Sequence, residues 1–412
     1  MLKPSEIIKY YTNDEVRHRI VEFATNREVV GRYLNGSYSK RPGVLMYDTD
    51  ILEMVKKGVS SFHASLERWT QPLLLATVDK KELSQIKLGW DLIIDIDCPI
   101  LDYSREAAFL LKEALEFHDI KHYGVKFSGN TGFHFIIPFE SFPEMIGDAE
   151  TRLLFPDAAR VILAYLREMM KDHLREYLLD IDSVDSIAKN LHKDVKDILA
   201  NGVLDPFKVV EFDPVAISPR HLVRMPYVFN EKSGLISIPI DPSRIKTFSL
   251  EEARPENVDP SKSFMPKVEK NEAKELFLQA FSLDRKEQEP SGSVINIDKE
   301  IPLESFPPCI RNILNGLEDG RKRGLFLLIN FLHAVKWPES KIKQTVLEWN
   351  KKNKEPLSNA YITSQLNYYK THSYMPPNCD NPIYKNINVC TPDDTCKIIK
   401  NPLSYAVKRR RK

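Results

Sequence analysis

The sequence has few cysteines, no long apolar run and almost no net charge, and each shortage excludes a class of protein. Its 412 residues include only five cysteines, which do not suggest a disulfide framework. No apolar run approaches the roughly 20 residues that a membrane helix needs, and the first residues lack the apolar segment of a signal peptide. We therefore expect a cytoplasmic protein without a membrane-spanning segment.

The composition is that of a folded protein with room for two or three domains. Hydrophobic residues make up 42% and charged residues 28% of the chain, which is ordinary for a globular protein. The net charge of +1 hides two basic runs, at 321–323 and at 408–412. Either run suits a polyanion such as nucleic acid. The terminal run is equally consistent with a solvated tail.

Periodicity and turn residues predict an alternation of strands and helices followed by a charged linker and a helical region. Residues 255–302 are polar and contain several prolines, which is typical of a linker. The expected helices are 6–11, 13–24, 104–118, 157–179 and, inside the linker, 270–281. The expected strands are 92–97, 123–127, 133–138, 208–212 and 235–240.

Two aspartates end a strongly apolar segment. Leu92-Ile93-Ile94 precedes Asp95-Ile96-Asp97, and residues two apart on a strand point to the same face. Two carboxylates held so close repel unless a cation neutralises them. Their oxygen atoms suit Mg²⁺ or Mn²⁺, the metals of phosphoryl transfer. A solvated strand end or a helix cap is the alternative interpretation of this pair alone.

A glycine-rich turn joins the next two expected strands. Ser128-Gly129-Asn130-Thr131-Gly132 lies between them and predicts a tight hairpin. Its backbone N–H groups can approach an anion, and the side chains of Ser128 and His134 can donate hydrogen bonds to phosphate oxygens. His134 as a hydrogen-bonded core histidine is the alternative.

A third group of polar residues follows later in the chain. An apolar segment ends in Asp213, and the segments 221–226 (His-Leu-Val-Arg-Met-Pro) and 232–234 (Lys-Ser-Gly) come next. Arg224 can bind phosphate through two parallel hydrogen bonds. A surface ion pair at Arg224 and a turn aspartate at Asp213 are the alternatives.

Together these segments resemble the small, catalytic subunit of archaeal and eukaryotic DNA primases. The strand-borne DxD, the SGxxGxH hairpin, a third Asp, the HLhR-x-P segment and the K-S-G turn occur in that family's order, over about residues 1–245. The resemblance implies that Asp95, Asp97 and Asp213 hold two Mg²⁺ or Mn²⁺ ions. It also implies that the nucleotide is bound by Ser128, Gly129, His134, His221, Arg224 and Lys232.

The chain departs from the family pattern in three places. Asn130-Thr131 and Asn230 replace residues that are usually basic or histidine, so part of the phosphate contact must come from elsewhere. No cysteine lies between Cys98 and Cys309, so we expect no zinc in the catalytic domain. Cys98 itself is predicted to be a packed thiol.

The other four cysteines follow residue 300 and are too widely spaced for a compact zinc knuckle. Thiolates converging on one centre suit zinc or an iron–sulfur cluster, and unrelated buried thiols are the alternative. Their proline and asparagine context resembles the C-terminal domain of the large primase subunit, over about residues 303–407. The resemblance implies a [4Fe–4S] cluster, in preference to zinc, and template and initiating-nucleotide contacts at a helix start. The cluster ligands would be Cys309, Cys379, Cys390 and Cys396, and the contacts Arg321, Lys322 and Arg323.

The expected fold class is an α/β (α+β) primase-type core with a mixed or antiparallel sheet and a helical insertion, plus a mainly helical C-terminal domain. The expected boundaries are 1–254 for the catalytic domain, 255–302 for the linker and 303–412 for the iron–sulfur domain. We predict an enzyme that makes primers de novo on single-stranded DNA from NTPs or dNTPs, nucleoid-associated, with a replicative helicase or polymerase as possible partner. The alternative is a polymerase of the same superfamily that extends or repairs ends without starting chains.

Overall fold

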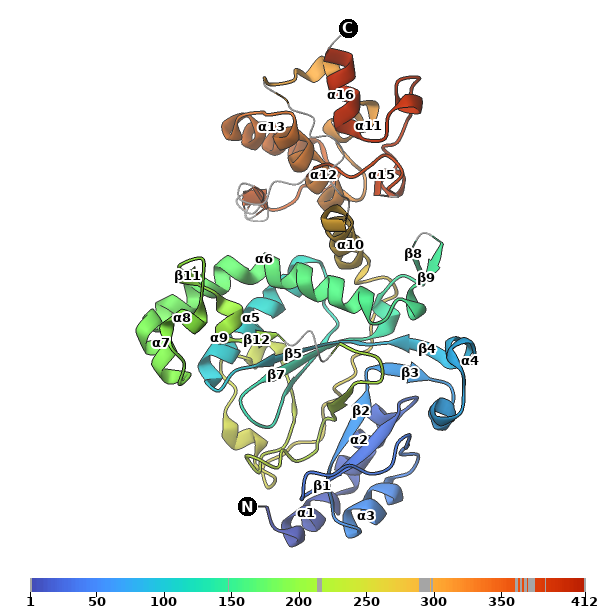
Figure 1. Cartoon of the computed structure of the whole chain (residues 1–412), viewed down its shortest axis with the longest axis vertical. Helices are drawn as coiled ribbons and strands as arrows, with labels where there is room; N and C mark the ends of the chain where they lie inside the picture. The colour runs from blue at the N-terminus through green and yellow to red at the C-terminus, as the bar shows by residue number, and fades with distance from the viewer. Residues whose placement is uncertain are drawn as a thin grey trace. The chain divides into compact units, whose positions relative to one another are not determined.

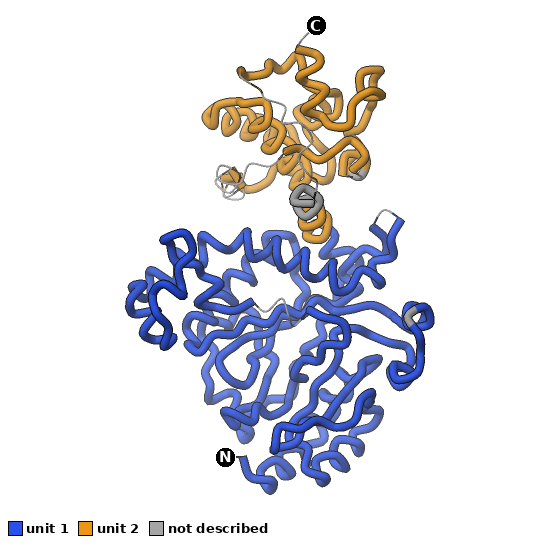
Figure 2. Tube along the Cα trace, viewed as in Figure 1, with its two compact units in different colours: residues 1–274 blue, residues 275–412 orange. Residues whose placement is uncertain are grey.

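The structure is a computed structural model that describes residues 2–146, 148–212, 217–288, 297, 299–359, 362–363, 365–366, 369, 375–381 and 383–410. It divides into two compact units, residues 1–274 and residues 275–412 (Figure 2). No helix among the described residues is both long and apolar enough to cross a membrane.

A five-stranded antiparallel sheet forms the centre of the first unit (Figure 1). Its strand order is β12-β5-β7-β6-β14, so the two strands of the β6–β7 hairpin lie beside β5. Helices α5 (Leu101–Phe117) and α6 (Asp157–Ile181) pack against each other, and α5 contacts β5 and β7. The strands are β5 (Leu92–Asp97), β6 (Gly124–Phe127), β7 (Phe133–Ile137), β12 (Glu211–Phe212) and β14 (Pro239–Ile240).

A second, three-stranded sheet has the order β1-β2-β13 and is also antiparallel. Every residue of β2 is buried, because helices and the neighbouring strands cover it. Asn13 caps the second helix by accepting hydrogen bonds from two backbone N–H groups, which fixes where that helix begins. The elements are α1 (Pro4–Tyr11), α2 (Asp14–Ala24), α3 (Asp48–Lys56), β1 (Val29–Tyr33), β2 (Val59–Ser65) and β13 (Leu222–Arg224).

Shorter elements complete the first unit. Helices α6 to α9 lie between β7 and β12 in the sequence and form the expected helical insertion. The remaining elements are β3 (Glu67–Trp69), η1 (Pro72–Ala76), α4 (Lys80–Ile86), β4 (Lys87–Trp90), η2 (Phe139–Ser141), β8 (Met145–Ile146), β9 (Ala149–Glu150), η3 (Thr151–Leu153), α7 (Val184–Asn190), α8 (Val195–Ile198), β10 (Leu199–Ala200), β11 (Val203–Leu204), α9 (Pro206–Val209), η4 (Pro242–Arg244) and η5 (Leu250–Ala253).

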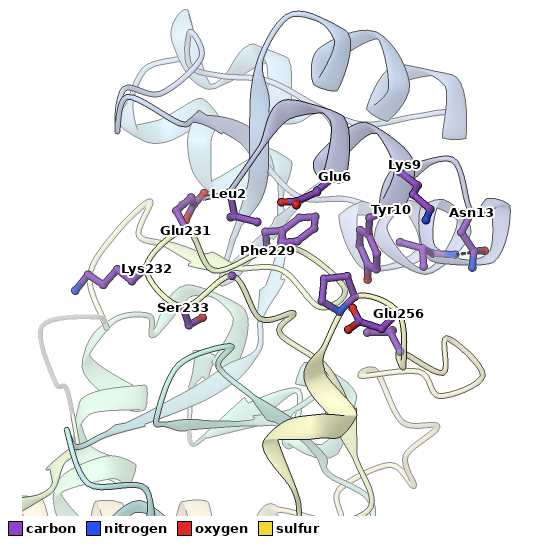
Figure 3. A pocket seen from close by; sticks show the side chains of 14 residues that line it. Leu2, Glu6, Lys9, Tyr10, Asn13, Phe229, Glu231, Lys232, Ser233 and Glu256 are labelled. Atoms are coloured by element: carbon purple, nitrogen blue, oxygen red, sulfur yellow. Dashed lines mark hydrogen bonds between the residues drawn. The ribbon is translucent and has the colours of Figure 1, made fainter.

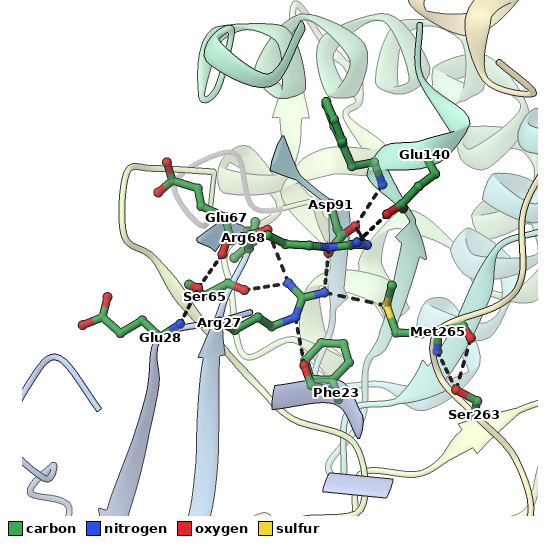
Figure 4. A network of polar contacts seen from close by, with 12 residues as sticks. Phe23, Arg27, Glu28, Ser65, Glu67, Arg68, Asp91, Glu140, Ser263 and Met265 are labelled. Carbon is green, nitrogen blue, oxygen red and sulfur yellow. Dashed lines mark hydrogen bonds and ion pairs between the residues drawn. The ribbon is translucent and has the colours of Figure 1, made fainter. Parts of the chain in front are cut away.

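A buried ion-pair network anchors the start of β5 (Figure 4). Asp91 is fully buried and pairs with Arg27, which is itself buried, and with Arg68. Arg68 also reaches Glu140 at 2.7 Å, and the backbone N–H of Phe139 donates to Asp91 at 2.9 Å. Charges are buried at low cost only when they are paired and hydrogen-bonded, as here. The network therefore ties α2, β3 and the segment after β7 to the strand that carries Asp95 and Asp97.

The second unit is mainly helical and has its own core. Leu325, Phe331 and Trp349 are fully buried in one apolar cluster of this unit. Its elements are α10 (Lys274–Gln288, whose first residue ends the first unit), η6 (Leu303–Ser305), α11 (Pro308–Leu314), α12 (Arg321–Ala334), α13 (Glu339–Lys352), α15 (Ile383–Asn386), η7 (Cys396–Ile398) and α16 (Pro402–Arg410).

The predicted combination of an α/β core with an antiparallel sheet and a mainly helical C-terminal part is confirmed, with differences in detail. The expected strand 208–212 is wrong in its first half, because Asp205 caps a short helix with Pro206 at its first position. Only Pro239–Ile240 of the expected strand 235–240 is a strand.

The first unit continues to residue 274, beyond the expected boundary at 254. Residues 255–274 pack on it because Phe264 is buried and the carbonyl of Lys262 accepts a hydrogen bond from the Tyr227 hydroxyl at 2.6 Å. Ala273 also donates its backbone N–H to the carbonyl of Ser141 at 2.8 Å. The part of the expected linker that lies before residue 275 therefore belongs to the compact first unit.

Candidate active site

Asp95 and Asp97 lie on one face of β5, as the sequence predicts. Asp95 stands directly opposite His134 on β7, and Asp97 directly opposite Glu211 on β12. Nε2 of His134 lies 3.3 Å from Oδ1 of Asp95, whose side chain is 30% exposed. Cross-strand partners share a face of the sheet. The structure therefore places three carboxylates and one imidazole on the same face.

The hairpin approaches the two aspartates closely at Gly132. A β-carbon at this position would collide with the carbonyl oxygen of Ile96 and would stand 3.2 Å from Oδ1 of Asp97. The glycine predicted for a tight turn is thus also required by close packing against β5. This contact brings the end of the hairpin turn beside Asp97.

The hairpin turn and the Lys232-Ser233-Gly234 turn lie against each other. Oγ of Ser128 accepts hydrogen bonds from the N–H of Asn130 at 3.3 Å and of Gly132 at 3.1 Å. The hydroxyl of Ser233 donates to the carbonyl of Gly129, which has a positive φ of 91°. The exposed Lys232 directly precedes Ser233 on the same turn. Two segments separated by a hundred residues in the sequence are therefore joined at the site.

Lys126 is a buried cation that the motif pattern does not include. It stands opposite His134 on β6 and donates from Nζ to Oγ of Ser237 at 2.8 Å. Burial lowers the pKa of Lys126 to about 7; Asp95 opposes this shift and Arg224 adds to it. Lys126 thus links the hairpin to the segment that follows the Lys-Ser-Gly turn.

Two buried histidines lie in the same region. Burial, together with the positive charges of Lys126, Arg224 and His63, lowers the pKa of His134 well below its usual value. His63 on β2 stands opposite Arg224, and burial and Arg224 lower its pKa to about 3. Nδ1 of each histidine is buried without a hydrogen-bond partner among the described residues. Both imidazoles are therefore neutral near pH 7.

Arg224 is held by a buried carboxylate. Its guanidinium donates to Oε2 of Glu231 at 3.0 Å and to the carbonyl of Phe229. Burial alone would raise the pKa of Glu231, but Arg224 and hydrogen bonds from Ser61 and Ser60 lower it to about 2. Glu231 is therefore ionised, and the ion pair that was the alternative interpretation of Arg224 is present, although it is buried rather than on the surface.

His221 and Asp213 are two further predicted site residues. His221 is half-buried just before β13, and its backbone N–H donates to the carbonyl of Ser218 at 3.0 Å. Asp213, the predicted third metal ligand, lies outside the described residues. Cys98 is buried, as predicted for a packed thiol, and burial raises its pKa to about 11.

The oxygen donors on β5 fit a hard divalent cation by their chemistry. Within the described ranges, no three His, Cys, Asp or Glu side chains are arranged to hold a metal ion. Asp213 is outside those ranges. Metal binding by the aspartates therefore stays a prediction.

A cavity of about 550 Å³ lies beside the Lys-Ser-Gly turn (Figure 3). Tyr10 and Phe229 line it together with Glu231, Lys232 and Ser233. Its size suits a small molecule. Glu231 lines this cavity and also pairs with Arg224. The cavity therefore adjoins the Arg224–Glu231 ion pair.

Sequence reasoning missed Lys126, His63, Glu231 and Arg32, the last of which also pairs with Glu231. Lys126 had a signal: it interrupts an apolar strand and, in the hairpin, faces the same side as His134. The other three come from segments that only sheet pairing brings together, so a single sequence offered no signal for them.

The four C-terminal cysteines of the second unit influence one another. Burial, followed by Cys379 and the other two thiols, raises the pKa of Cys309 to about 12. Burial, Cys396 and Cys390 raise that of Cys379 to about 11. Burial, followed by three of these cysteines, also raises the pKa of Tyr384. The thiols therefore lie near enough to influence one another, but within the described ranges no three Cys, His, Asp or Glu side chains are arranged to hold a metal ion. Thiolates suit zinc or an iron–sulfur cluster, and the cluster stays a prediction.

The basic run of the second unit begins helix α12 at Arg321, as predicted. Arg321 pairs with Glu355 at 2.9 Å, and Nε of Arg323, which is 7% exposed, lies 2.8 Å from a carboxylate oxygen of Glu275. Lys322 is half-buried between them. The charges of Arg321 and Arg323 are thus partly neutralised within the unit.

No protein-family model matches the chain. It is 29% identical over an alignment of 146 residues to the DNA primase large subunit of Thermococcus kodakarensis, and the match covers 26% of this chain and 36% of that relative's length. The polymerase domain of Mycobacterium tuberculosis ligase D, solved in complex with DNA, superposes on 64% of this chain and 86% of its own, with 12% identity and a TM-score of 0.37. A score that low carries no functional argument. The chain is therefore similar, over part of its length, to a primase large subunit.

Proposed function

We propose that this chain is a primase-superfamily nucleotidyltransferase that synthesises short primers de novo on single-stranded DNA. The observation that carries the proposal is the convergence of separated motifs at one site. The hairpin of Ser128 to His134 packs beside Asp95 and Asp97, and the Lys-Ser-Gly turn is bonded to that hairpin. The partial similarity to a primase large subunit supports it independently.

The residues of the site have distinct roles in this proposal. Asp95, Asp97 and Asp213 would hold Mg²⁺ or Mn²⁺, which supplies the activation of the primer 3′-hydroxyl and the stabilisation of the leaving pyrophosphate. Ser128 and the backbone N–H groups at Gly129 would bind phosphate oxygens, with Lys232, His221 and Arg224 adding positive charge or hydrogen bonds. His134 would orient Asp95 through their 3.3 Å contact.

The second unit would start the chain. Cys309, Cys379, Cys390 and Cys396 would bind a [4Fe–4S] cluster, with zinc as the less favoured ligand. Arg321, Lys322 and Arg323, at the first turn of α12, would contact template or initiating nucleotide, because a helix N-terminus favours phosphate. Tethering this unit to the catalytic unit would raise its effective concentration to about the millimolar range.

The substrates implied are NTPs or dNTPs and a single-stranded DNA template. A replicative helicase or polymerase would be the partner that uses the primer. The cytoplasmic, nucleoid-associated location predicted from the sequence goes with this role.

The test is primer-free synthesis on single-stranded DNA with Mg²⁺ or Mn²⁺, using anaerobically purified full-length chain. The variants are Asp95→Asn/Asp97→Asn and, as control, Asp197→Asn, an exposed aspartate of α8. We expect de novo products from the parent and the control only. Extension of a supplied primer without de novo products would favour the alternative, a superfamily polymerase that extends ends. Synthesis by the double variant would refute the proposed chemistry.

A further inference from the structure

A second arginine, Arg32, stands beside Arg224 although it belongs to none of the motifs. Arg32 lies on β1 opposite Ser61 of β2, two residues from His63. His63 is in turn opposite Arg224 on β13. Because residues two apart on a strand share a face, Arg32, His63 and Arg224 all project from the same face of the three-stranded sheet.

One carboxylate oxygen connects the two arginines. Oε2 of Glu231 lies 2.6 Å from Nη1 of Arg32 and 3.0 Å from Nη2 of Arg224. Its other oxygen accepts hydrogen bonds from Ser60, at 2.8 Å, and from Ser61. Glu231 is thereby fixed in place, and both guanidinium groups are within hydrogen-bond reach of one shared anion.

The charges at this point do not balance. Two guanidinium groups face a single carboxylate, and Lys126 lies near enough to affect His63. Asp95, another carboxylate of the site, contacts His134, whereas both arginines pair with Glu231. Arg224 and Arg32 both act to lower the pKa of His63, after burial, so the local field already disfavours another proton. Such a surplus of positive charge favours a multiply charged anion.

The region is also open to a ligand. The side chain of Arg32 is 26% exposed and that of Arg224 16%. Tyr38, which forms a β-bridge with Arg32, is 53% exposed and packs its ring edge against His63 with the centroids 5.6 Å apart. Arg32 therefore stands between solvent and the buried part of the site.

We propose that Arg32 is a further substrate-binding residue, which binds the triphosphate of the incoming nucleotide together with Arg224. Glu231 is a positioning residue that holds the two guanidinium groups side by side. A planar guanidinium can donate two parallel hydrogen bonds to phosphate oxygens, and two guanidinium groups side by side can bind neighbouring phosphates. This inference rests on the proposed function, since a nucleotidyltransferase is what brings a triphosphate to this site.

The test measures binding of inorganic tripolyphosphate and of ATP, in the presence of Mg²⁺, to the full-length chain by calorimetry. The variants are Arg32→Gln and Arg32→Lys. The lysine variant keeps the charge facing Glu231 but loses the planar guanidinium and its two parallel hydrogen bonds. Arg244→Gln is the control, because Arg244 makes a two-bond ion pair with Glu252 outside the site. Binding of single-stranded DNA and the nucleotide KM and kcat are measured in parallel.

We expect Arg32→Gln to weaken both ligands about 10- to 100-fold, to raise KM more than it lowers kcat, and to leave DNA binding unchanged. Arg32→Lys should fall in between and Arg244→Gln should match the parent. Parental affinity in a folded Arg32→Gln or Arg32→Lys protein would overturn the inference and leave the proposed function standing. Weaker DNA binding with unchanged nucleotide binding would overturn it too. A parent that binds neither ligand and makes no product would overturn the proposed function itself.

Discussion

Replacing Asp91 by asparagine tests how the strand that carries Asp95 and Asp97 is held. Asp91 is fully buried and pairs with Arg27 and Arg68 (Figure 4). Asparagine keeps an acceptor for the N–H of Phe139 but removes the charge. Breaking one partner out of a buried ion pair costs about 3–5 kcal/mol, because the remaining charge stays buried.

Two features place the expected loss at about 3 kcal/mol, the lower end of that range. Arg68 keeps Glu140 at 2.7 Å, and Arg27 keeps the carbonyls of Phe23 and Ser65 as acceptors. The pH dependence has a definite sign. Burial raises the pKa of Asp91, but Arg27 and Arg68 outweigh it, so the net shift is downward. The stabilisation is therefore complete above the unfolded pKa near 3.9 and is lost only as the pH falls through the lower folded pKa.

Urea unfolding at pH 7, followed by hydrogen exchange of peptides from β5 and β7, measures this loss. Asp102→Asn is the control, because Asp102 also pairs with an arginine but its side chain is 68% exposed. An exposed pair of this kind contributes about 0.5 kcal/mol or less. If Asp91→Asn destabilises the unit by under about 1 kcal/mol, like the control, the network does not hold the strand as argued.

Three further outcomes follow from the same geometry. Gly132→Ala should abolish nucleotide incorporation and cost about 1–3 kcal/mol, because its β-carbon meets the carbonyl of Ile96; Gly202→Ala, where φ is 80° and space is open, should keep activity. The free energy of unfolding should rise between pH 7 and about 10.4, because over this range Lys126 is protonated in the unfolded chain but not in the folded one. Lys126→Met should flatten that rise when denaturation is measured as a function of pH. Anaerobic protein should contain about four iron atoms per chain by elemental analysis; Cys379→Ser should lower that number, and a Cys98→Ser control should not.

The five-stranded core was largely predictable from the sequence. Leu92 to Asp97 and the hairpin after Tyr123 carry long apolar runs bounded by glycine and asparagine, and β5, β6 and β7 lie where these patterns put them. The placement of Asp95 beside His134 follows from the antiparallel pairing of adjacent strands. Local pattern and tertiary structure agree here, so few residues were needed to predict the arrangement.

Other parts depended on contacts that no local pattern encodes. Residues 255–274 are polar enough to suggest a linker, yet Phe264 inserts into the first unit and its carbonyl lies where a β-carbon of Gly124 would be. Glu231 stands beside Lys232 in the sequence, but its partner Arg32 lies two hundred residues earlier on β1. Tertiary pairing of distant strands decides such contacts.

The buried basic side chains of the site argue for a ligand rather than for stability. Lys126 is fully buried, His63 and His134 nearly so, and each has its pKa lowered first of all by burial. Apolar residues of similar volume would need no hydrogen-bond partners and would stabilise the unit in the absence of substrate. Retaining three such groups around Arg224 is explained if a bound anion accepts hydrogen bonds from them and favours their protonated forms. We therefore expect Lys126→Met to be more stable than the parent and to bind triphosphate less tightly, since stability is given up at this site for ligand binding.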